Sequence, residues 1–269
     1  MTAPALPMLL APVTVTADTN DDIRIEGDSA ATATITAGTY YISGLADSGD
    51  LLTAIQTALD DSADAGDWTV TTTAYGLTYR KPTFSCNTTD SSAWSIDWDY
   101  TAGSFYPFDA TILGVTDTSA AFGTTDGNYS AVSTQPKYSW YPSSAPSSDS
   151  AHGTTAEPTE SNISQRRAPS GAVWTVRHGG PFETRLVLWE GEPYYKMFPD
   201  GSYPNESLKT FIETYAYAGQ RLRYYPDRTA AGYFDCVLDE ETLREFKPPR
   251  LAPGVALYSV TLGMLGYVA

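Results

Sequence analysis

Few residues in this sequence have the types and spacing that catalysis requires. The chain has two histidines, His152 and His178, and neither has a partner histidine at helical spacing or belongs to a Cys/His cluster typical of zinc sites. No glycine-rich phosphate-binding motif and no GxSxG turn occurs. The sequence therefore predicts no nucleophilic centre and no bound cofactor.

Paired carboxylates leave one route to an enzyme open. Asp97 and Asp99 flank Trp98, while Glu190 and Glu192 follow Trp189. Two carboxylates near aromatic rings are typical of a glycosidase cleft. However, acids two positions apart on a strand point to the same side, and such pairs usually face solvent. We therefore predict that the chain is not an enzyme and has no catalytic residues.

Metal and disulfide sites are also weakly indicated. The segment DTNDD at 18–22 resembles the first half of a calcium loop, but Ile23 replaces the required glycine and Ser29 the final glutamate. We expect an acidic hairpin and no metal.

Cys86 and Cys236 are the two cysteines of the chain. Two free buried thiols and a disulfide between the domains both fit the sequence, because the spacing of cysteines does not decide whether they pair.

The negative charge is confined to the first part of the chain. The net charge of the 269 residues is −16. Residues 1–160 hold 20 acidic and 4 basic residues, and residues 161–269 hold 12 of each. The first part therefore faces solvent, ions or a lumen, whereas the second can pack on neighbours without strong repulsion. This distribution argues against a duplex-DNA binder, which needs a basic surface.

The sequence predicts a chain without membrane contact. No continuous apolar run reaches the roughly 18 residues that a membrane-spanning helix needs. The N-terminal residues lack the basic start of a signal peptide and contain three prolines. We expect synthesis in the cytoplasm.

The stretch from Asn205 to Tyr267 organises the second half. Its apolar spacing predicts a helix that Asn205 caps and Gly219 ends, with an apolar face formed by Leu208, Phe211, Ile212 and Tyr215. Three runs rich in aromatic or β-branched residues follow and predict strands at Arg221–Tyr225, Tyr233–Leu238 and Ala256–Leu262. Strands are also expected at Val173–Val176 and Glu183–Trp189.

The first half follows a similar plan of strands, one helix and more strands. Ser48 or Asp50 caps a helix whose apolar face is Leu51, Leu52, Ile55 and Leu59. The predicted strands are Val13–Thr16, Asp22–Glu26, Trp68–Thr73, Leu77–Arg80, Ala93–Tyr100 and Phe108–Val115, with a strand pair or one bent strand at Ala33–Ile42.

These patterns predict a mainly β (α+β) protein with two β-sandwich or barrel-like domains, each packed by one helix. Residues 1–12 form an extended arm because of their prolines. Residues 13–130 form the acidic N-terminal domain, and residues 131–269 form the C-terminal domain. Because residues 142–165 are rich in Ser, Pro, Thr and Gly, we expect a long loop there.

Two stretches resemble a family of tailed-bacteriophage virion proteins. The first, GTYYISGLADSGDLLTAIQTALDD…WTVTTTAYGLTYRKP…ILGV, lies within residues 38–115. The second, SGAVWTVRHGG…RLVLW…LKTFIETYAYAGQRLRYYPDRTAAGYFDCVLDEE…YSVTLGM, lies within residues 170–264 and is similar to tail-tube-like and distal-tail modules. The resemblance rests on layout and composition and covers most of the chain.

The resemblance implies a structural protein of the virion tail, forming a ring at the tail tip or distal tail (the baseplate). It implies a homo-oligomer, for example a hexamer, that contacts other tail proteins, is assembled in the host cytoplasm, and lets DNA pass through a lumen without specific binding. A tail tube, terminator or connector protein would share the same features.

Two further expectations concern surfaces. Arg223, Tyr224 and Tyr225 are candidate subunit-interface anchors, since Tyr and Arg dominate interface hot spots; the alternative is ordinary packing within a strand. A function from another class, a non-catalytic carbohydrate-binding β-module, also fits the many Trp and Tyr residues.

Overall fold

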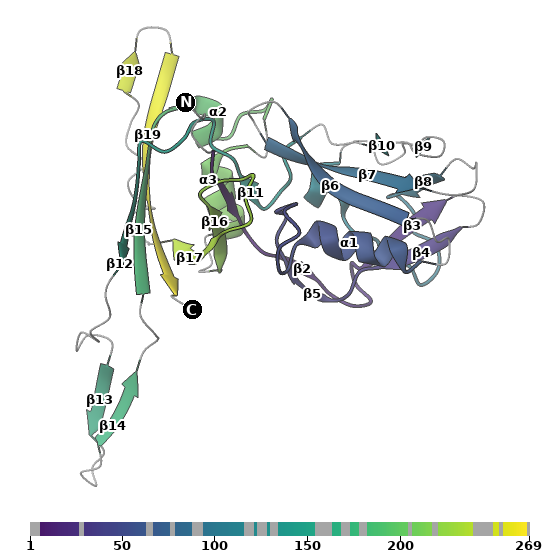
Figure 1. Ribbon diagram of the computed structural model, residues 1–269, viewed down its shortest axis with the longest axis horizontal. Coiled ribbons are helices and arrows are strands. Elements are labelled where there is room, and N and C mark those ends of the chain that lie inside the picture. The colour runs from purple at the N-terminus through teal and green to yellow at the C-terminus, as the bar shows by residue number, and fades with distance from the viewer. Residues whose placement is uncertain are drawn as a thin grey trace.

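The computed structural model is built mainly from strands, with few helices (Figure 1). The mainly β class predicted from the sequence is therefore confirmed. The structure describes residues 6–26, 30–62, 67–75, 79–87, 94–115, 121–122, 128–129, 134–153, 163–167, 173–177, 182–203, 206–216, 220–238, 250–252 and 255–267.

The largest sheet has eight antiparallel strands in the order β11-β1-β16-β17-β19-β15-β12, with β18 beside β19. Its longest strands, β15 and β19, pair along most of their length in Figure 1. The bounds are β1 Met8–Leu10, β11 Ser139–Trp140, β12 Ser148–Gly153, β15 Phe182–Pro193, β16 Leu222–Tyr225, β17 Phe234–Leu238, β18 Arg250–Ala252 and β19 Val255–Tyr267.

The first half of the chain forms three smaller sheets around one helix. Strands β3, β4, β8 and β9 form one sheet, β6, β7 and β10 a second, and β2 and β5 a third. Because β2 pairs with β5 and β3 with β4 and β8, the acidic segment at 18–22 joins two different sheets, and the expected acidic hairpin is wrong. The bounds are β2 Val13–Val15, β3 Asp22–Glu26, β4 Ala31–Thr34, β5 Gly38–Tyr40, β6 Asp67–Tyr75, β7 Tyr79–Asn87, β8 Trp94–Asp97, β9 Ala121–Phe122 and β10 Asn128–Tyr129.

Helix α1, Leu51–Asp60, matches its prediction closely. Asp50 caps it, accepting a hydrogen bond from the Leu52 amide. The predicted apolar face is buried, with Leu51, Leu52, Ile55 and Leu59 all fully enclosed. The helix lies against β6 in the first half of the chain (Figure 1).

The predicted strand Phe108–Val115 is instead a short 3-10 helix, η1, Ala110–Leu113. Asp109 caps this turn by accepting a 2.9 Å hydrogen bond from the Thr111 amide. Gly114 ends it with φ +80°, and a Cβ built there would lie 2.4 Å from the Thr134 carbonyl oxygen. The Asp cap and the glycine therefore override the strand propensity of the residues between them.

The prediction of an extended arm at residues 1–12 is wrong for residues 8–10, which form a strand. Strand β1 pairs with β11 on one side and β16 on the other, so it lies inside the largest sheet. Met8, Leu9 and Leu10 are all buried. Pro7 and Pro12 flank these three residues and do not interrupt them, which leaves their backbone groups available for pairing.

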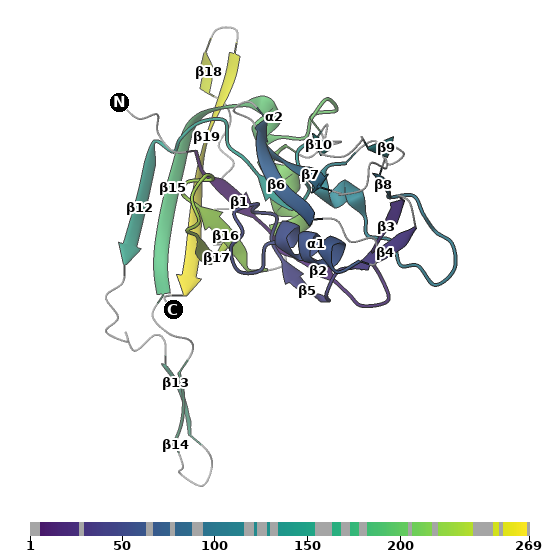
Figure 2. The ribbon, with the colours of Figure 1, turned by 45° about the vertical axis from the view of Figure 1, so that its right-hand side comes forward.

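The expected loop at residues 142–165 contains strand β12 and the start of another strand. β12 pairs with β15 over six residue pairs. Strands β13, Ile163–Arg167, and β14, Val173–Arg177, pair with each other and project away from the rest of the molecule in both views (Figures 1 and 2). The polar composition concealed β12, because backbone pairing with β15 does not require apolar side chains.

The second predicted helix starts later than expected. Helix α3 spans Leu208–Phe211 and continues as a π-helical turn, η3, at Ile212–Ala216. Ser207 caps it by accepting a 3.0 Å hydrogen bond from the Thr210 amide, whereas Asn205 and Gly219 lie outside the described residues. Leu208, Phe211 and Ile212 are buried as predicted.

Two hydrophobic clusters share the wall formed by β1 and β16. Met8, Leu10 and Tyr225 belong to the first cluster, which holds the core of the N-terminal half. Leu9 and Tyr224 belong to the second, which holds the core of the C-terminal half. Because alternate residues of a strand point to opposite faces, each of these strands contributes to both clusters.

Candidate functional site

The structure places the three candidate interface residues inside the chain. Arg223, Tyr224 and Tyr225 follow one another on β16 and are 8%, 1% and 0% exposed. We expected them to anchor a second subunit, but residues of the same chain occupy the space around their side chains. Packing within the fold, the alternative that the sequence left open, describes their observed surroundings.

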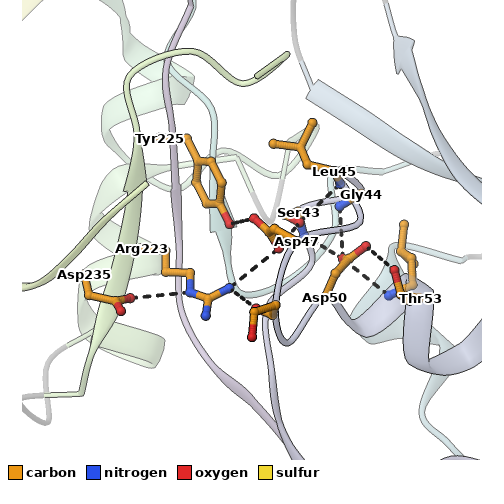
Figure 3. A network of polar contacts seen from close by, with 11 residues as sticks. Ser43, Gly44, Leu45, Asp47, Asp50, Thr53, Arg223, Tyr225 and Asp235 are labelled. Atoms are coloured by element: carbon orange, nitrogen blue, oxygen red, sulfur yellow. Dashed lines mark hydrogen bonds and ion pairs between the residues drawn. The ribbon is translucent and has the colours of Figure 1, made fainter. Parts of the chain in front are cut away.

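Arg223 and Tyr225 form a junction between β16 and the segment before α1 (Figure 3). Arg223 Nη1 donates a 2.6 Å hydrogen bond to the Ser48 carbonyl oxygen and lies 3.6 Å from Asp47 Oδ1. Arg223 Nε lies 3.4 Å from Asp235 Oδ1. The guanidinium is therefore shared between two carboxylates and one carbonyl oxygen.

Two aromatic rings enclose the same guanidinium. Its Cζ lies 4.1 Å from the ring centroid of Tyr41 and 4.0 Å from that of Tyr233. Cation–π contacts of this kind gain strength when water is excluded. Tyr225 completes the junction by donating a hydrogen bond to Asp47 Oδ2. Burial raises the pKa of Tyr225, and the bond to Asp47 raises it further, so the phenol stays protonated.

The segment that presents Asp47 is itself held in place by Asp50. The Asp50 carboxylate accepts hydrogen bonds from the amides of Ser43 and Gly44 and from the Thr53 hydroxyl, in addition to capping α1 (Figure 3). Burial raises the pKa of Asp50, and the amide hydrogen bonds oppose that shift. One carboxylate thus fixes both the helix start and the turn that carries Asp47.

Tyr224 points away from this junction, towards the long strands. Its hydroxyl donates a 3.1 Å hydrogen bond to Asp149 Oδ2 on β12. Arg185 on β15 binds the same carboxylate at 2.6 and 2.8 Å, and its guanidinium lies over the Tyr224 ring. Because β12 and β16 are far apart in the strand order, the sheet must curl to bring them together.

The structure separates the carboxylate pair at Glu190 and Glu192. A β-bulge lies between them, with Gly191 at φ +92°. Glu190 is exposed, whereas Glu192 is fully buried and accepts four hydrogen bonds from the amides and hydroxyls of Ser143 and Ser144. Glu192 therefore has a structural role, and the pair does not form a two-carboxylate cleft.

Among the described residues, the other candidates do not gather into a site. Asp97 Oδ1 accepts a hydrogen bond from the Asp99 amide, which closes a turn. His152 lies on β12, while His178 is outside the described residues. Within the described ranges, no group of three or more His, Cys, Asp or Glu residues could hold a metal ion.

Cys236 is a free, buried thiol on β17. Burial raises its pKa to about 12, which keeps it protonated. Of the two arrangements that the sequence left open, a free thiol is therefore confirmed for Cys236. Cys86 lies on β7, and its side chain is outside the described part of the structure.

A polar cluster that the sequence did not reveal lies at helix α2, Tyr194–Met197. Lys196 is fully buried and its Nζ lies 2.5 Å from Glu206 Oε2. Gln135, also fully buried, accepts a 3.5 Å hydrogen bond from the same Nζ. The sequence around Lys196 does not indicate that this lysine is buried. Its partners Glu206 and Gln135 lie 10 and 61 positions away in the sequence.

Aromatic side chains also gather around α2. The ring of Tyr194 stacks on Phe198 at 5.4 Å, and both rings contact Tyr258. Tyr195 packs on Tyr203 at 4.6 Å. Tyr194 and Tyr203 are 48% and 45% exposed. We call these five residues the α2 aromatic cluster.

Comparison of the sequence with protein-family models found no match, and comparisons with curated proteins and with solved structures found none either. Among the described helices, none is long and apolar enough to cross a membrane.

Proposed function

We propose that this chain is a structural component of a bacteriophage tail, assembling as a homo-oligomeric ring at the tail tip. In this proposal each hydrophobic cluster is the core of one β-sandwich or barrel-like domain packed by one helix. The tail-tube, terminator and connector roles belong to the same class. The layout resemblance at residues 38–115 and 170–264 supplies the class, and the geometry below supports an assembly role.

The observation that carries the proposal is the paired strands β13 and β14, which project from one end of the largest sheet (Figure 2). A two-stranded ribbon buries little apolar surface alone, so it is stabilised best by packing on another surface. Beside it, β12 ends the strand order of the sheet, and no described strand pairs with its far side. Exposed sheet edges are natural sites for pairing with a second copy.

The charge distribution supports the same proposal. Residues 1–160 carry the entire net charge of −16, whereas residues 161–269 are balanced. In a ring, the balanced part could contact neighbouring subunits with little repulsion. An acidic surface lining a lumen would repel the DNA backbone, so that DNA could pass without specific binding.

The proposal is tested by shortening the projecting ribbon. Replacing residues 154–181 with a short Gly-Ser linker removes β13 and β14 but keeps β12 and β15. We expect the intact chain to form discrete multimers in negative-stain images and the shortened chain to lose them while keeping its circular dichroism spectrum. Equal assembly of both chains would refute a role for the ribbon.

The α2 aromatic cluster favours a second candidate, a non-catalytic carbohydrate-binding module. Exposed tyrosine rings provide flat apolar faces against which sugar rings can stack. A glycan array should then give binding that the double change Tyr194→Ala and Tyr203→Ala abolishes. Tyr106→Ala, which removes a tyrosine that is 36% exposed elsewhere, is the matched control.

A further inference from the structure

Three buried side chains around α2 bring an amine, a carboxylate and an amide group into contact. The amine of Lys196 lies 2.5 Å from a carboxylate oxygen of Glu206 and 3.5 Å from the amide oxygen of Gln135. Lys196 and Gln135 are 0% exposed and Glu206 is 6% exposed. A nucleophile, a proton acceptor and an acyl group are thus in contact and shielded from water.

Lys196 is desolvated, which makes its amine easier to deprotonate than an exposed lysine. Burial lowers the pKa of Lys196, and the charge of Glu206 opposes that shift. The charge of a second carboxylate, Glu192, also opposes the shift in the pKa of Lys196, although Glu192 itself accepts four hydrogen bonds from Ser143 and Ser144. A desolvated lysine beside a proton acceptor is the arrangement that activates an amine for attack on a carbonyl carbon.

The amide of Gln135 is held in place beside Lys196. Its Nε2 donates a 2.7 Å hydrogen bond to the Ser139 carbonyl oxygen, while its Oε1 faces Lys196 Nζ. This orientation is maintained from both ends of the amide group. The lysine backbone is fixed too, because Trp140 Nε1 donates a 3.0 Å hydrogen bond to the Lys196 carbonyl oxygen.

We propose that Lys196 and Gln135 react within the folded chain to form an isopeptide bond, with Glu206 as the proton acceptor and donor. Lys196 Nζ first passes a proton to Glu206. The free amine then attacks Gln135 Cδ, forming a C–N bond and a tetrahedral centre. Protons pass from Nζ to Nε2, partly through Glu206, and the Cδ–Nε2 bond breaks.

The reaction needs no oxidant, reductant or further reactant. One amide is exchanged for another and one ammonia leaves, and that ammonia takes up the proton left on Glu206. Gln135 is a better acyl group than Glu206, because an ionised carboxylate resists nucleophilic attack whereas an amide remains neutral. Exclusion of water from the cluster also protects the acyl centre against hydrolysis.

The bond would join two parts of the fold that are 61 positions apart in the sequence. Gln135 lies in the segment that leads into β11, which pairs with β1 of the shared wall, and Lys196 lies on α2 at the end of β15. The covalent link would therefore fix the shared wall to the long strands.

Intact mass spectrometry of the purified, folded full-length chain tests this directly. The crosslinked chain is lighter than the sequence mass by about 17 Da, the mass of ammonia, whereas condensation of Lys196 with Glu206 would remove about 18 Da as water. We expect the loss of ammonia, together with a tryptic crosslinked peptide that contains Gln135 and an uncleaved Lys196. An unchanged mass after prolonged incubation of the folded chain would overturn the proposal.

Three variants assign the roles. Lys196→Arg and Gln135→Met should each restore the full mass, and Glu206→Gln should slow or abolish the loss while keeping a hydrogen-bonding side chain in place. Lys209→Arg changes an exposed lysine of α3 and should leave the crosslink intact. A mass loss that persists in Lys196→Arg would come from another residue, such as an asparagine that closes on its own backbone, and would contradict the assignment.

Discussion

Arg223 donates a 2.6 Å hydrogen bond to the carbonyl oxygen of Ser48, although 175 positions separate the two residues in the sequence. This bond, with the contacts of Arg223 to Asp47 and of Tyr225 to Asp47, ties β16 of the largest sheet to the segment before α1 (Figure 3). The two halves of the chain are therefore joined by a polar junction as well as by shared strands.

The junction predicts a large stability loss for Arg223→Ala. The change leaves Asp47, whose side chain is 8% exposed, without its cation. Removing one partner of a buried ion pair costs about 3 kcal/mol or more. Lys209→Ala, which removes a basic side chain that is 42% exposed, is the control and should change the free energy of unfolding by less than about 0.5 kcal/mol. Urea unfolding of both variants provides the comparison, and equal effects would contradict the account.

Glu192→Gln should destabilise the chain whereas Glu190→Gln should not. Glu192 accepts four hydrogen bonds from Ser143 and Ser144, so loss of its charge weakens the whole set and forces the new amide NH2 to face donors. We expect a loss of about 2 kcal/mol, since hydrogen bonds to charged groups are stronger than neutral ones. The melting temperatures of the two variants provide the comparison. A larger decrease for Glu190→Gln than for Glu192→Gln would contradict the structural role of Glu192.

Gly114→Ala should cost more than Gly103→Ala. Both glycines have positive φ, +80° at Gly114 and +73° at Gly103. Alanine is strained in this left-handed conformation, so each change should lower the free energy of unfolding by about 1 kcal/mol. At Gly114 a Cβ would also lie 2.4 Å from the Thr134 carbonyl oxygen, whereas at Gly103 nothing lies within 4 Å. The difference in unfolding free energy between the two variants measures the clash. Similar values would mean that the 134–136 segment moves aside freely.

Stability should fall as the pH rises from 9 towards 12. Burial raises the pKa of Tyr215 from 10.0 to about 12 and that of Cys236 from 9.0 to about 12. In this range the folded chain keeps protons that the unfolded chain releases, so unfolding becomes more favourable with increasing pH. Below about pH 8 these groups are protonated in both states and contribute no slope.

Urea midpoints measured across this pH range test the prediction. The variant Tyr215→Phe removes one of the shifted groups and should flatten the decline. A midpoint that is constant up to pH 12, or a steeper decline in Tyr215→Phe, would contradict the assigned burial.

Local features of the fold were predictable from the sequence, and long-range ones were not. The start of α1 at Asp50 and its apolar face follow from residues within ten positions of one another. The burial of β1 could not be predicted, because its partners β11 and β16 lie more than a hundred residues later. The prolines around β1 indicated an arm, but they only limit its length.

The candidate site shows the same division. The sequence singled out Arg223 and Tyr225 by residue type, yet their partners Ser48 and Asp47 are distant in sequence and carry no pattern that points to β16. The strand β12 was hidden by its serines, although Asp149 on it binds Arg185. Partners that are fixed by tertiary packing leave little trace in a single sequence.

The native mass of the purified chain tests the proposed assembly role most directly. Light scattering coupled to size-exclusion chromatography, repeated over a range of concentrations, distinguishes the 29.1 kDa monomer from discrete multimers. The account predicts a defined multiple of that mass, such as a hexamer, with ring-shaped particles in images of the same fraction. A 29.1 kDa species at every concentration would contradict it and would favour the carbohydrate-binding alternative.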